Sequence, residues 1–256
     1  MFISLGVNIS MMRYRNQILI GITVTLLLVA AGFIVWAETP YKPEQKALKS
    51  LESTNVVRVK LDKDLFFIPR DSSSGVGVII YPGGRVDPRA YAPLAHGIAG
   101  EGYLTVIIDM PLNLAVFDYD AALDILPRYP EVDLWVVGGH SLGGSMAARL
   151  VHRNPGVFEG LFLWASYPAS SDDLKGQNIT VCTIYGSEDG LTSQGDIENS
   201  LDLLPEETIV KNIEGGNHAQ FGSYGPQNGD NEAMITEEEQ HEQILVAMIE
   251  LLNAVS

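Results

Sequence analysis

Ser141 lies at the centre of the stretch Gly-His-Ser-Leu-Gly, residues 139–143, and its setting points to chemistry. The apolar run 134–137 ends just before this stretch and a helical pattern begins at Leu142, which predicts a sharp turn from a strand into a helix. Glycines suit such a turn because a side chain would collide with the strand or the helix. We therefore expect Ser141 to be a nucleophile in acyl transfer, with the Leu142 backbone N–H facing the oxyanion.

Two later apolar runs lead into the groups that would activate this serine. Asp189 follows the run 181–185, and His218 follows the run 208–213 on a glycine-rich loop. The chain order of serine, carboxylate and histidine is the order used by one large class of hydrolytic folds. We expect His218 to be the general base that takes the serine proton, and Asp189 to fix the tautomer of His218.

A glycine-rich turn, Tyr81–Arg85, follows the run 76–81 and offers a second oxyanion donor. The donor at such a turn is a backbone N–H, so Gly84 and Arg85 are the candidates. His140 fills the variable position of the serine turn, and the sequence gives no reason to assign it a role.

Neither a metal nor a cofactor is expected, because no cluster of His, Cys or carboxylates has metal-ligand spacing. Cys182 is the single cysteine and lies in an apolar run, which favours a buried structural thiol over a nucleophile. The polar segment 222–231 is interpreted as a surface loop. A border of the binding pocket and a cation site at Asp230 are the alternatives, and a complete EF-hand pattern is absent.

The elements that must position these groups alternate between strands and helices. The pattern predicts strands at 56–61, 65–68, 76–81, 104–108, 134–137, 161–164, 181–185 and 208–213, and helices at 87–101, 142–152 and 237–253. The first two strands read as an antiparallel edge pair, and the continuous apolar runs after them are typical of a parallel sheet with helices on both faces. The loop 166–178 is too short for a helical lid.

The N-terminal run Ile18–Ala37 carries no charge and matches the roughly 20 residues that cross a bilayer core. We divide the chain into a transmembrane or signal segment (1–37), a tether (38–52) and a catalytic domain (53–256). The length favours an uncleaved anchor, and Arg13 and Arg15 before the span favour a domain outside the cytoplasm. Secretion after signal cleavage is the alternative.

Composition excludes several classes of partner. The chain is 46% hydrophobic with a formal net charge of −16 and 16 Lys and Arg residues, which is typical of a globular body with an acidic surface. Binding to nucleic acid needs clustered basic residues, so no such partner is expected. We expect a small-molecule substrate and a membrane contact through the N-terminal segment, and the sequence does not set an oligomeric state.

The stretches YPGGRVDPRAY (81–91), GHSLG (139–143) and GGNHAQFG (215–222), taken in this order, resemble the α/β-hydrolase superfamily. The likeness is to its small lidless bacterial members near the dienelactone hydrolases. It implies an α/β-hydrolase fold without a cap, a Ser141–Asp189–His218 triad and hydrolysis of carboxylic esters of small acyl substrates. Dienelactone hydrolases have a cysteine where this chain has Ser141, which disfavours dienelactone as the substrate. Thioester, lactone or peptide cleavage is an alternative, and a catalytically silent binding domain is a third interpretation.

Overall fold

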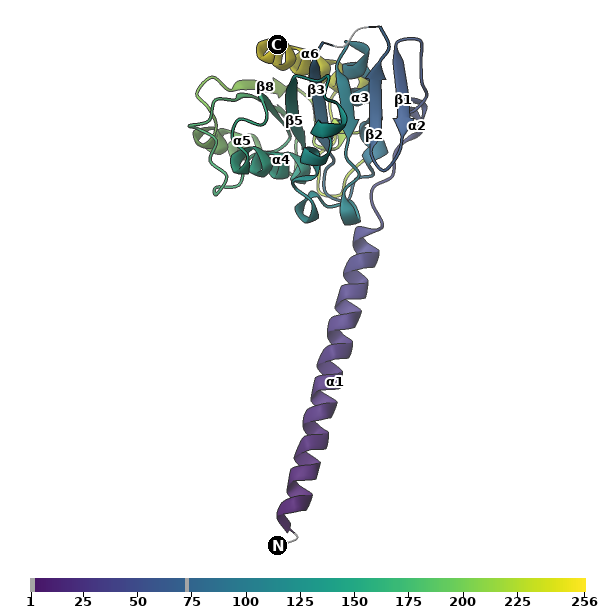
Figure 1. Ribbon diagram of the computed structural model, residues 1–256, viewed down its shortest axis with the longest axis vertical. Coiled ribbons are helices and arrows are strands. Elements are labelled where there is room, and N and C mark those ends of the chain that lie inside the picture. The colour runs from purple at the N-terminus through teal and green to yellow at the C-terminus, as the bar shows by residue number, and fades with distance from the viewer. Residues whose placement is uncertain (1–2, 72–73) are drawn as a thin grey trace. The chain divides into compact units, whose positions relative to one another are not determined.

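The computed structural model describes residues 3–71 and 74–256, and the chain divides into two compact units, Met1–Thr39 and Pro40–Ser256. The first unit is the helix α1 (Ile3–Ala37), and the second contains every other helix and strand described below. Figure 1 labels most of these helices and strands.

Helix α1 contains a 24-residue stretch, Tyr14–Ala37, that is long and apolar enough to cross a membrane. Its large apolar side chains are exposed in the structure, from Ile18 to Trp36. An α-helix that is apolar on all sides has no polar face to turn toward water. The structure therefore contains the apolar N-terminal helix that the sequence predicts.

The second unit is built on one eight-stranded sheet with the strand order β1-β2-β4-β3-β5-β6-β7-β8. Its strands are β1 (Val57–Leu61), β2 (Leu65–Pro69), β3 (Val76–Tyr81), β4 (Leu104–Ile107), β5 (Leu134–His140), β6 (Gly160–Trp164), β7 (Thr180–Gly186) and β8 (Ile209–Ile213). Strand β2 is antiparallel to both β1 and β4, and all other neighbours are parallel. The predicted edge pair and the mostly parallel sheet are confirmed.

Helices cover both faces of the sheet, as the alternating pattern predicts. On one face α3 (Ala92–Gly100) and α6 (Glu237–Val255) pack into a core with Val78, Ile80 and Phe162. On the other face α4 (Leu142–Arg153) packs into a second core with Ile79 and Leu163. Neighbouring residues of one strand thus enter different cores, because successive side chains of a strand point to opposite faces.

The strand order reverses at β3, which lies between β4 and β5. Crevices for ligands form at the carboxyl ends of strands at such a reversal. Tyr81 at the end of β3 pairs with Gly139 near the end of β5, so the turns that follow the two strands leave the sheet side by side. These are the turns that carry the expected second oxyanion donor and the expected nucleophile.

Several connections differ from a simple alternation of strands and helices. The crossover from β4 to β5 contains four short 3-10 turns, at Pro111–Asn113, Ala115–Phe117, Ala121–Asp124 and Leu126–Arg128, in place of an α-helix. Short helices at Gln45–Lys49 (α2) and Gln194–Ser200 (α5) were not predicted. Between β6 and β7 the described chain holds no helix or strand, and no cap domain is evident in it.

The close packing of β5 against β6 gives a first testable prediction. A Cβ on Gly138 would lie 2.1 Å from the Phe162 carbonyl oxygen, whereas a Cβ on Gly100 would meet no atom within 4 Å. We expect Gly138→Ala to lower the free energy of unfolding by about 1–3 kcal/mol or more, because the strand must shift. Gly100→Ala should be neutral or slightly stabilising. Urea unfolding of both variants checks this, and equal stability of the two would contradict it.

Candidate active site

Ser141 begins the turn between β5 and α4 and has the backbone angles φ 51° and ψ −121°. A positive φ is rare for a residue with a side chain and costs about 1–3 kcal/mol. Two hydrogen bonds hold this backbone: the Ser141 N–H donates to the Trp164 carbonyl at 2.9 Å, and the Ser166 hydroxyl donates to the Ser141 carbonyl at 2.6 Å. The strained turn is therefore fixed by the neighbouring strand β6 and the residues after it.

Glycines flank Ser141 because backbone atoms occupy the space that side chains would need. A Cβ on Gly139 or Gly143 would lie 2.2 or 2.3 Å from the Tyr81 carbonyl oxygen, and one on Gly144 would lie 2.6 Å from the Gly139 carbonyl oxygen. Real Cβ atoms do not approach so closely. The end of β3 can thus lie directly against the serine turn.

The turn after β3 lies beside Leu142, the first residue of α4. A Cβ on Gly84 would meet the Leu142 Cδ2 atom at 3.1 Å. The Leu142 N–H has no partner within its own helix, as is usual for the first residues of a helix. Among the described backbone hydrogen bonds, none has the Gly84 N–H as its donor.

Arg85, the alternative donor, has its N–H engaged. The Arg85 N–H donates to the Asn113 carbonyl at 2.8 Å, and Arg85 adopts a φ of 57°. An N–H already bound to a carbonyl is not free to face an oxyanion. Of the two expected donors on this turn, Gly84 is therefore the remaining candidate.

Asp189 and His218 are brought together from loops after β7 and β8. The His218 Nδ1 atom lies 2.8 Å from Asp189 Oδ2, and both side chains are almost completely buried. The second carboxylate oxygen of Asp189 accepts the N–H groups of Leu191 at 2.8 Å and Thr192 at 2.6 Å. These three bonds fix the carboxylate. Because a carboxylate only accepts, the ring proton of His218 that faces Asp189 is on Nδ1.

The other ring nitrogen of His218 has no partner. Nε2 is buried, and no side chain or backbone group in the described ranges hydrogen-bonds to it. Buried polar atoms are nearly always paired, so an orphaned acceptor needs an explanation. The His218 ring lies 4.5 Å, centroid to centroid, from the ring of His140, which directly precedes Ser141. The orphaned atom therefore belongs to a ring beside the serine turn.

His140 has structural partners that the sequence did not indicate. The Tyr91 hydroxyl accepts the Gly83 N–H at 2.9 Å and lies 2.8 Å from His140 Nδ1, so its own proton is available to His140. Burial lowers the pKa of His140 well below its usual range, and the nearby His218 adds to this. A neutral His140 thus joins the glycine turn after β3 to the serine turn through Tyr91, and Phe221 stacks on its ring.

A residue of the expected tether also holds the turn after β3. Tyr41 forms an isolated parallel bridge with Val86: its N–H donates to the Arg85 carbonyl at 2.7 Å, and its carbonyl accepts the Asp87 N–H at 3.0 Å. The sequence carried no signal for this contact, because the partners are 45 positions apart and neither has a distinctive type.

The remaining candidate ligands and nucleophiles lie elsewhere. Burial raises the pKa of Cys182 to about 12, which keeps this thiol protonated. Burial lowers the pKa of His241, on α6, to about 4. Within residues 3–71 and 74–256 no group of three or more His, Cys, Asp or Glu side chains is arranged to hold a metal ion.

A sequence model described as the alpha/beta hydrolase family matches residues 77–242. This range contains the turn after β3, the serine turn and the loops of Asp189 and His218. No curated protein matches the chain.

Solved structures with similar folds come from several sources. A CIB-like hydrolase of Thermoplasma acidophilum is 14% identical, with a TM-score of 0.54 over 76% of this chain and 99% of that one. The α/β hydrolase MGS-MChE2, from a sediment metagenome of the Mar Chica lagoon in Morocco, is 16% identical, with a TM-score of 0.56 over 75% and 98%. An esterase domain of a Rhodothermus marinus protein is 10% identical, with a TM-score of 0.56 over 75% and 91%. At these identities the likeness concerns the fold.

The Tyr91 contacts give a second testable prediction. Tyr91→Phe removes the acceptor of the buried Gly83 N–H and the partner of His140, and leaving such groups unpaired costs about 1–3 kcal/mol of unfolding free energy. The matched control is Tyr103→Phe, whose hydroxyl lies 3.4 Å from Asn253 Oδ1 and is part-buried. Urea unfolding should show a clear loss for Tyr91→Phe and a smaller one for Tyr103→Phe. The reverse order would contradict this assignment.

Proposed function

Because the chain belongs to the alpha/beta hydrolase family, we propose that it is a serine hydrolase that cleaves carboxylic esters of small acyl substrates. Ser141 is the nucleophile, His218 the general base and Asp189 the residue that orients it. The observation that carries this proposal is the buried, unpartnered Nε2 of His218, on a ring that lies beside the serine turn and is bound at Nδ1 by Asp189. An acceptor left open there is what a serine proton requires.

The reaction proceeds in two halves. In the first, the Ser141 oxygen attacks the ester carbonyl carbon while His218 Nε2 takes the hydroxyl proton, and a tetrahedral intermediate forms. The intermediate collapses, the bond to the alcohol oxygen breaks, and His218 returns the proton to the departing alcohol. In the second half water attacks the acyl-serine with its proton passing to His218, and the acid leaves as Ser141 recovers a proton.

Two backbone N–H groups stabilise the charge that develops on the carbonyl oxygen. Leu142 supplies one from the first turn of α4, where the helix dipole also favours a negative charge. Gly84 supplies the other from the turn after β3. Each such donor contributes about 2.7–4 kcal/mol of transition-state stabilisation.

Asp189 keeps the base in the correct tautomer. With Nδ1–H donating to the carboxylate, the lone pair of His218 is on Nε2, and the imidazolium that forms during attack is stabilised by the negative charge. Burial of both side chains strengthens this interaction because water does not screen it. The pair acts as a unit, and loss of either member should cost most of the rate.

An ester substrate is supported by one similar structure, which is described as an esterase domain. The described chain between β6 and β7 adds no helix or strand that would form a cap. Thioesters, lactones and peptides would use the same steps, since the triad sets the mechanism and the pocket sets the substrate.

The catalytic proposal predicts hydrolysis of short p-nitrophenyl esters and labelling of Ser141 by a fluorophosphonate. Ser141→Ala should lower kcat by about 10⁴-fold or more and abolish labelling. Ser145→Ala is the matched control. Ser145 lies four positions after Ser141, and its hydroxyl donates to the Tyr167 carbonyl at 2.6 Å. Hydrolysis that survives Ser141→Ala at the wild-type rate would refute the assignment, and a series of acyl chain lengths would define the pocket.

We propose that the apolar N-terminal helix anchors the protein in a membrane. The uncharged run Ile18–Ala37 of α1 serves as an uncleaved membrane anchor, and Arg13 and Arg15 before it hold the N-terminus in the cytoplasm with the catalytic unit outside. Its length exceeds the 7–15 apolar residues of a usual signal peptide.

Cell fractionation tests the anchor directly. The full chain should remain with membranes after carbonate extraction, and its intact mass should retain residues 14–37, because burying this apolar stretch in lipid is strongly favourable. A variant that begins at Thr39 should leave the membrane fraction. A mature chain recovered free of membranes with its N-terminus near residue 38 would instead indicate a cleaved signal peptide.

A further inference from the structure

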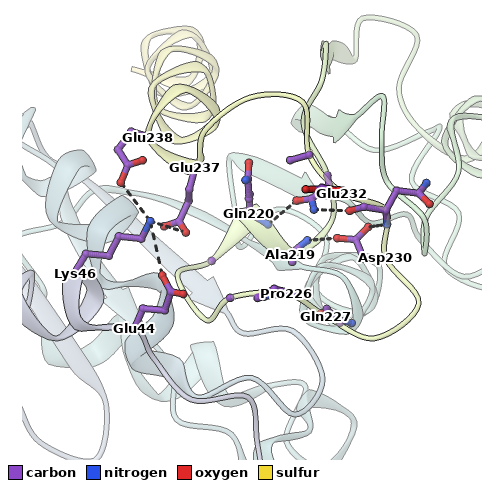
Figure 2. A pocket seen from close by; sticks show the side chains of 15 residues that line it. Glu44, Lys46, Ala219, Gln220, Pro226, Gln227, Asp230, Glu232, Glu237 and Glu238 are labelled. Atoms are coloured by element: carbon purple, nitrogen blue, oxygen red, sulfur yellow. Dashed lines mark hydrogen bonds and ion pairs between the residues drawn. The ribbon is translucent and has the colours of Figure 1, made fainter.

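Asp230 lies in the segment that follows the His218 loop, and its carboxylate accepts hydrogen bonds from backbone N–H groups. Asp230 Oδ1 accepts the N–H groups of Gly190 at 3.0 Å, Asn231 at 2.9 Å and His218 at 3.3 Å, and Oδ2 accepts the Ala219 N–H at 2.8 Å. Figure 2 shows the carboxylate turned toward the Ala219 backbone. The sequence left a surface loop, a pocket border and a cation site open for this segment.

The N–H groups bound by Asp230 come from both loops of the proposed acid and base. Gly190 directly follows Asp189, and the other loop contributes His218 itself and the next residue. The side chains of Asp189 and His218 are joined at 2.8 Å on the inner side of these loops. Nearer the strands the loops are also joined by the Glu188 N–H, which donates to the Gly216 carbonyl at 2.8 Å, and by the Gly215 N–H, which donates to the Ser187 hydroxyl at 2.8 Å. The Asp230 carboxylate adds a further connection at the residues beside Asp189 and His218.

The residues on either side of Asp230 pack closely against both loops. The Asn217 side-chain amide donates to the Asn231 carbonyl at 2.8 Å. A Cβ on Gly190 would lie 2.7 Å from the Asn231 nitrogen and 2.8 Å from the Gly229 oxygen. Gly190 thus has room for no side chain, and the backbone around Asp230 lies in contact with the residue after Asp189.

The outer side of this arrangement is open. Asp230 borders a cavity of about 610 Å³ whose wall also contains Asn217, Ala219 and Glu232. The opposite side of this cavity carries Lys46, which forms an ion pair with Glu237 at 2.8 Å, as Figure 2 shows. Glu232 shares the loop and the cavity with Asp230 but forms no hydrogen bond or ion pair with the described residues, so it offers a matched control.

We propose that Asp230 is a positioning residue that holds the loops of Asp189 and His218 in register, so that the Nε2 atom of His218 stays aimed at the serine turn. This inference rests on the proposed hydrolase function. A carboxylate accepts N–H groups on both oxygens, whereas alanine accepts none and asparagine has one acceptor oxygen. Without it the backbone of Gly190 loses its link to His218 and Ala219. The loops then stay joined only by the Asp189–His218 bond and by the hydrogen bonds nearer the strands.

The test compares full-length Asp230→Ala and Asp230→Asn with Glu232→Gln. A misplacement of catalytic groups by about 1 Å can reduce the rate about 10²-fold. We therefore expect kcat on a short p-nitrophenyl ester to fall about 10- to 100-fold in Asp230→Ala, with KM unchanged. Asp230→Asn should lie between Asp230→Ala and the wild type. Glu232→Gln should stay within about twofold of it, because this change removes the same charge without touching a backbone N–H.

A spectroscopic readout separates positioning from general loss of structure. The downfield proton resonance of the His218 Nδ1–H bound to Asp189 should broaden or vanish in Asp230→Ala and persist in Glu232→Gln. Amide hydrogen exchange at Gly190 and Ala219 should become faster in Asp230→Ala than in the wild type. These measurements need no substrate, so they test the inference even if the wild type hydrolyses no ester, which would count against the proposed function.

Three results would overturn the positioning role. Wild-type kcat and an unchanged downfield resonance in Asp230→Ala would show that the loops do not need the Asp230 connection. Equal losses of kcat in Asp230→Ala and Glu232→Gln would show that the loss of a negative charge, and not the loss of positioning, lowers the rate. Failure of both Asp230 variants to fold would assign the residue to the stability of the unit.

Discussion

The Tyr81 carbonyl oxygen occupies the space that side chains on Gly139 and Gly143 would fill, so the end of β3 lies directly against the turn after β5. This close approach puts the turn that contains Gly84 beside Leu142. Ser141, between the two glycines, adopts a strained conformation with a φ of 51°. Such strain costs about 1–3 kcal/mol and persists only where the surroundings enforce it. Here the enforcing contacts are the hydrogen bonds of the Ser141 backbone with the Trp164 carbonyl and the Ser166 hydroxyl, which do not depend on the substrate.

The proposed orienting carboxylate and general base are held by a different part of the sheet. Asp189 and His218 follow β7 and β8, which pair in parallel as far as Gly186 and Ile213, and the ring of His218 returns to lie against His140. This contact between two buried imidazoles links the halves of the site. Within the first half, the hydrogen bonds from Gly83 through Tyr91 to His140 join the turns after β3 and β5. Neutral His140 lets both rings lie close without repulsion between charges.

The sequence was sufficient where a local pattern determines a structure. Continuous apolar runs predicted the five strands β3 to β7, because strands buried on both faces leave no polar positions, and shorter mixed runs predicted β1, β2 and β8. The glycines around Ser141 predicted the serine turn. Contacts between distant residues were not predictable in this way. His140 looked like a variable position, Tyr41 like part of a tether, and Asp230 like an exposed acid, since each acts through partners that only the folded chain brings near. The engaged N–H of Arg85 was hidden for the same reason, because its acceptor Asn113 lies in irregular 3-10 turns that carry no periodic signal.

The central claim is that Ser141, His218 and the N–H groups of Leu142 and Gly84 converge on one reacting carbonyl. A crystal structure of the protein after reaction with a fluorophosphonate tests this most directly, because the phosphonate copies the tetrahedral intermediate. The account predicts phosphorus bonded to the Ser141 oxygen, with one phosphonyl oxygen about 2.7–3.1 Å from the Leu142 and Gly84 nitrogens and His218 Nε2 turned toward the adduct. An adduct on another residue, or a phosphonyl oxygen pointing away from both N–H groups, would contradict it.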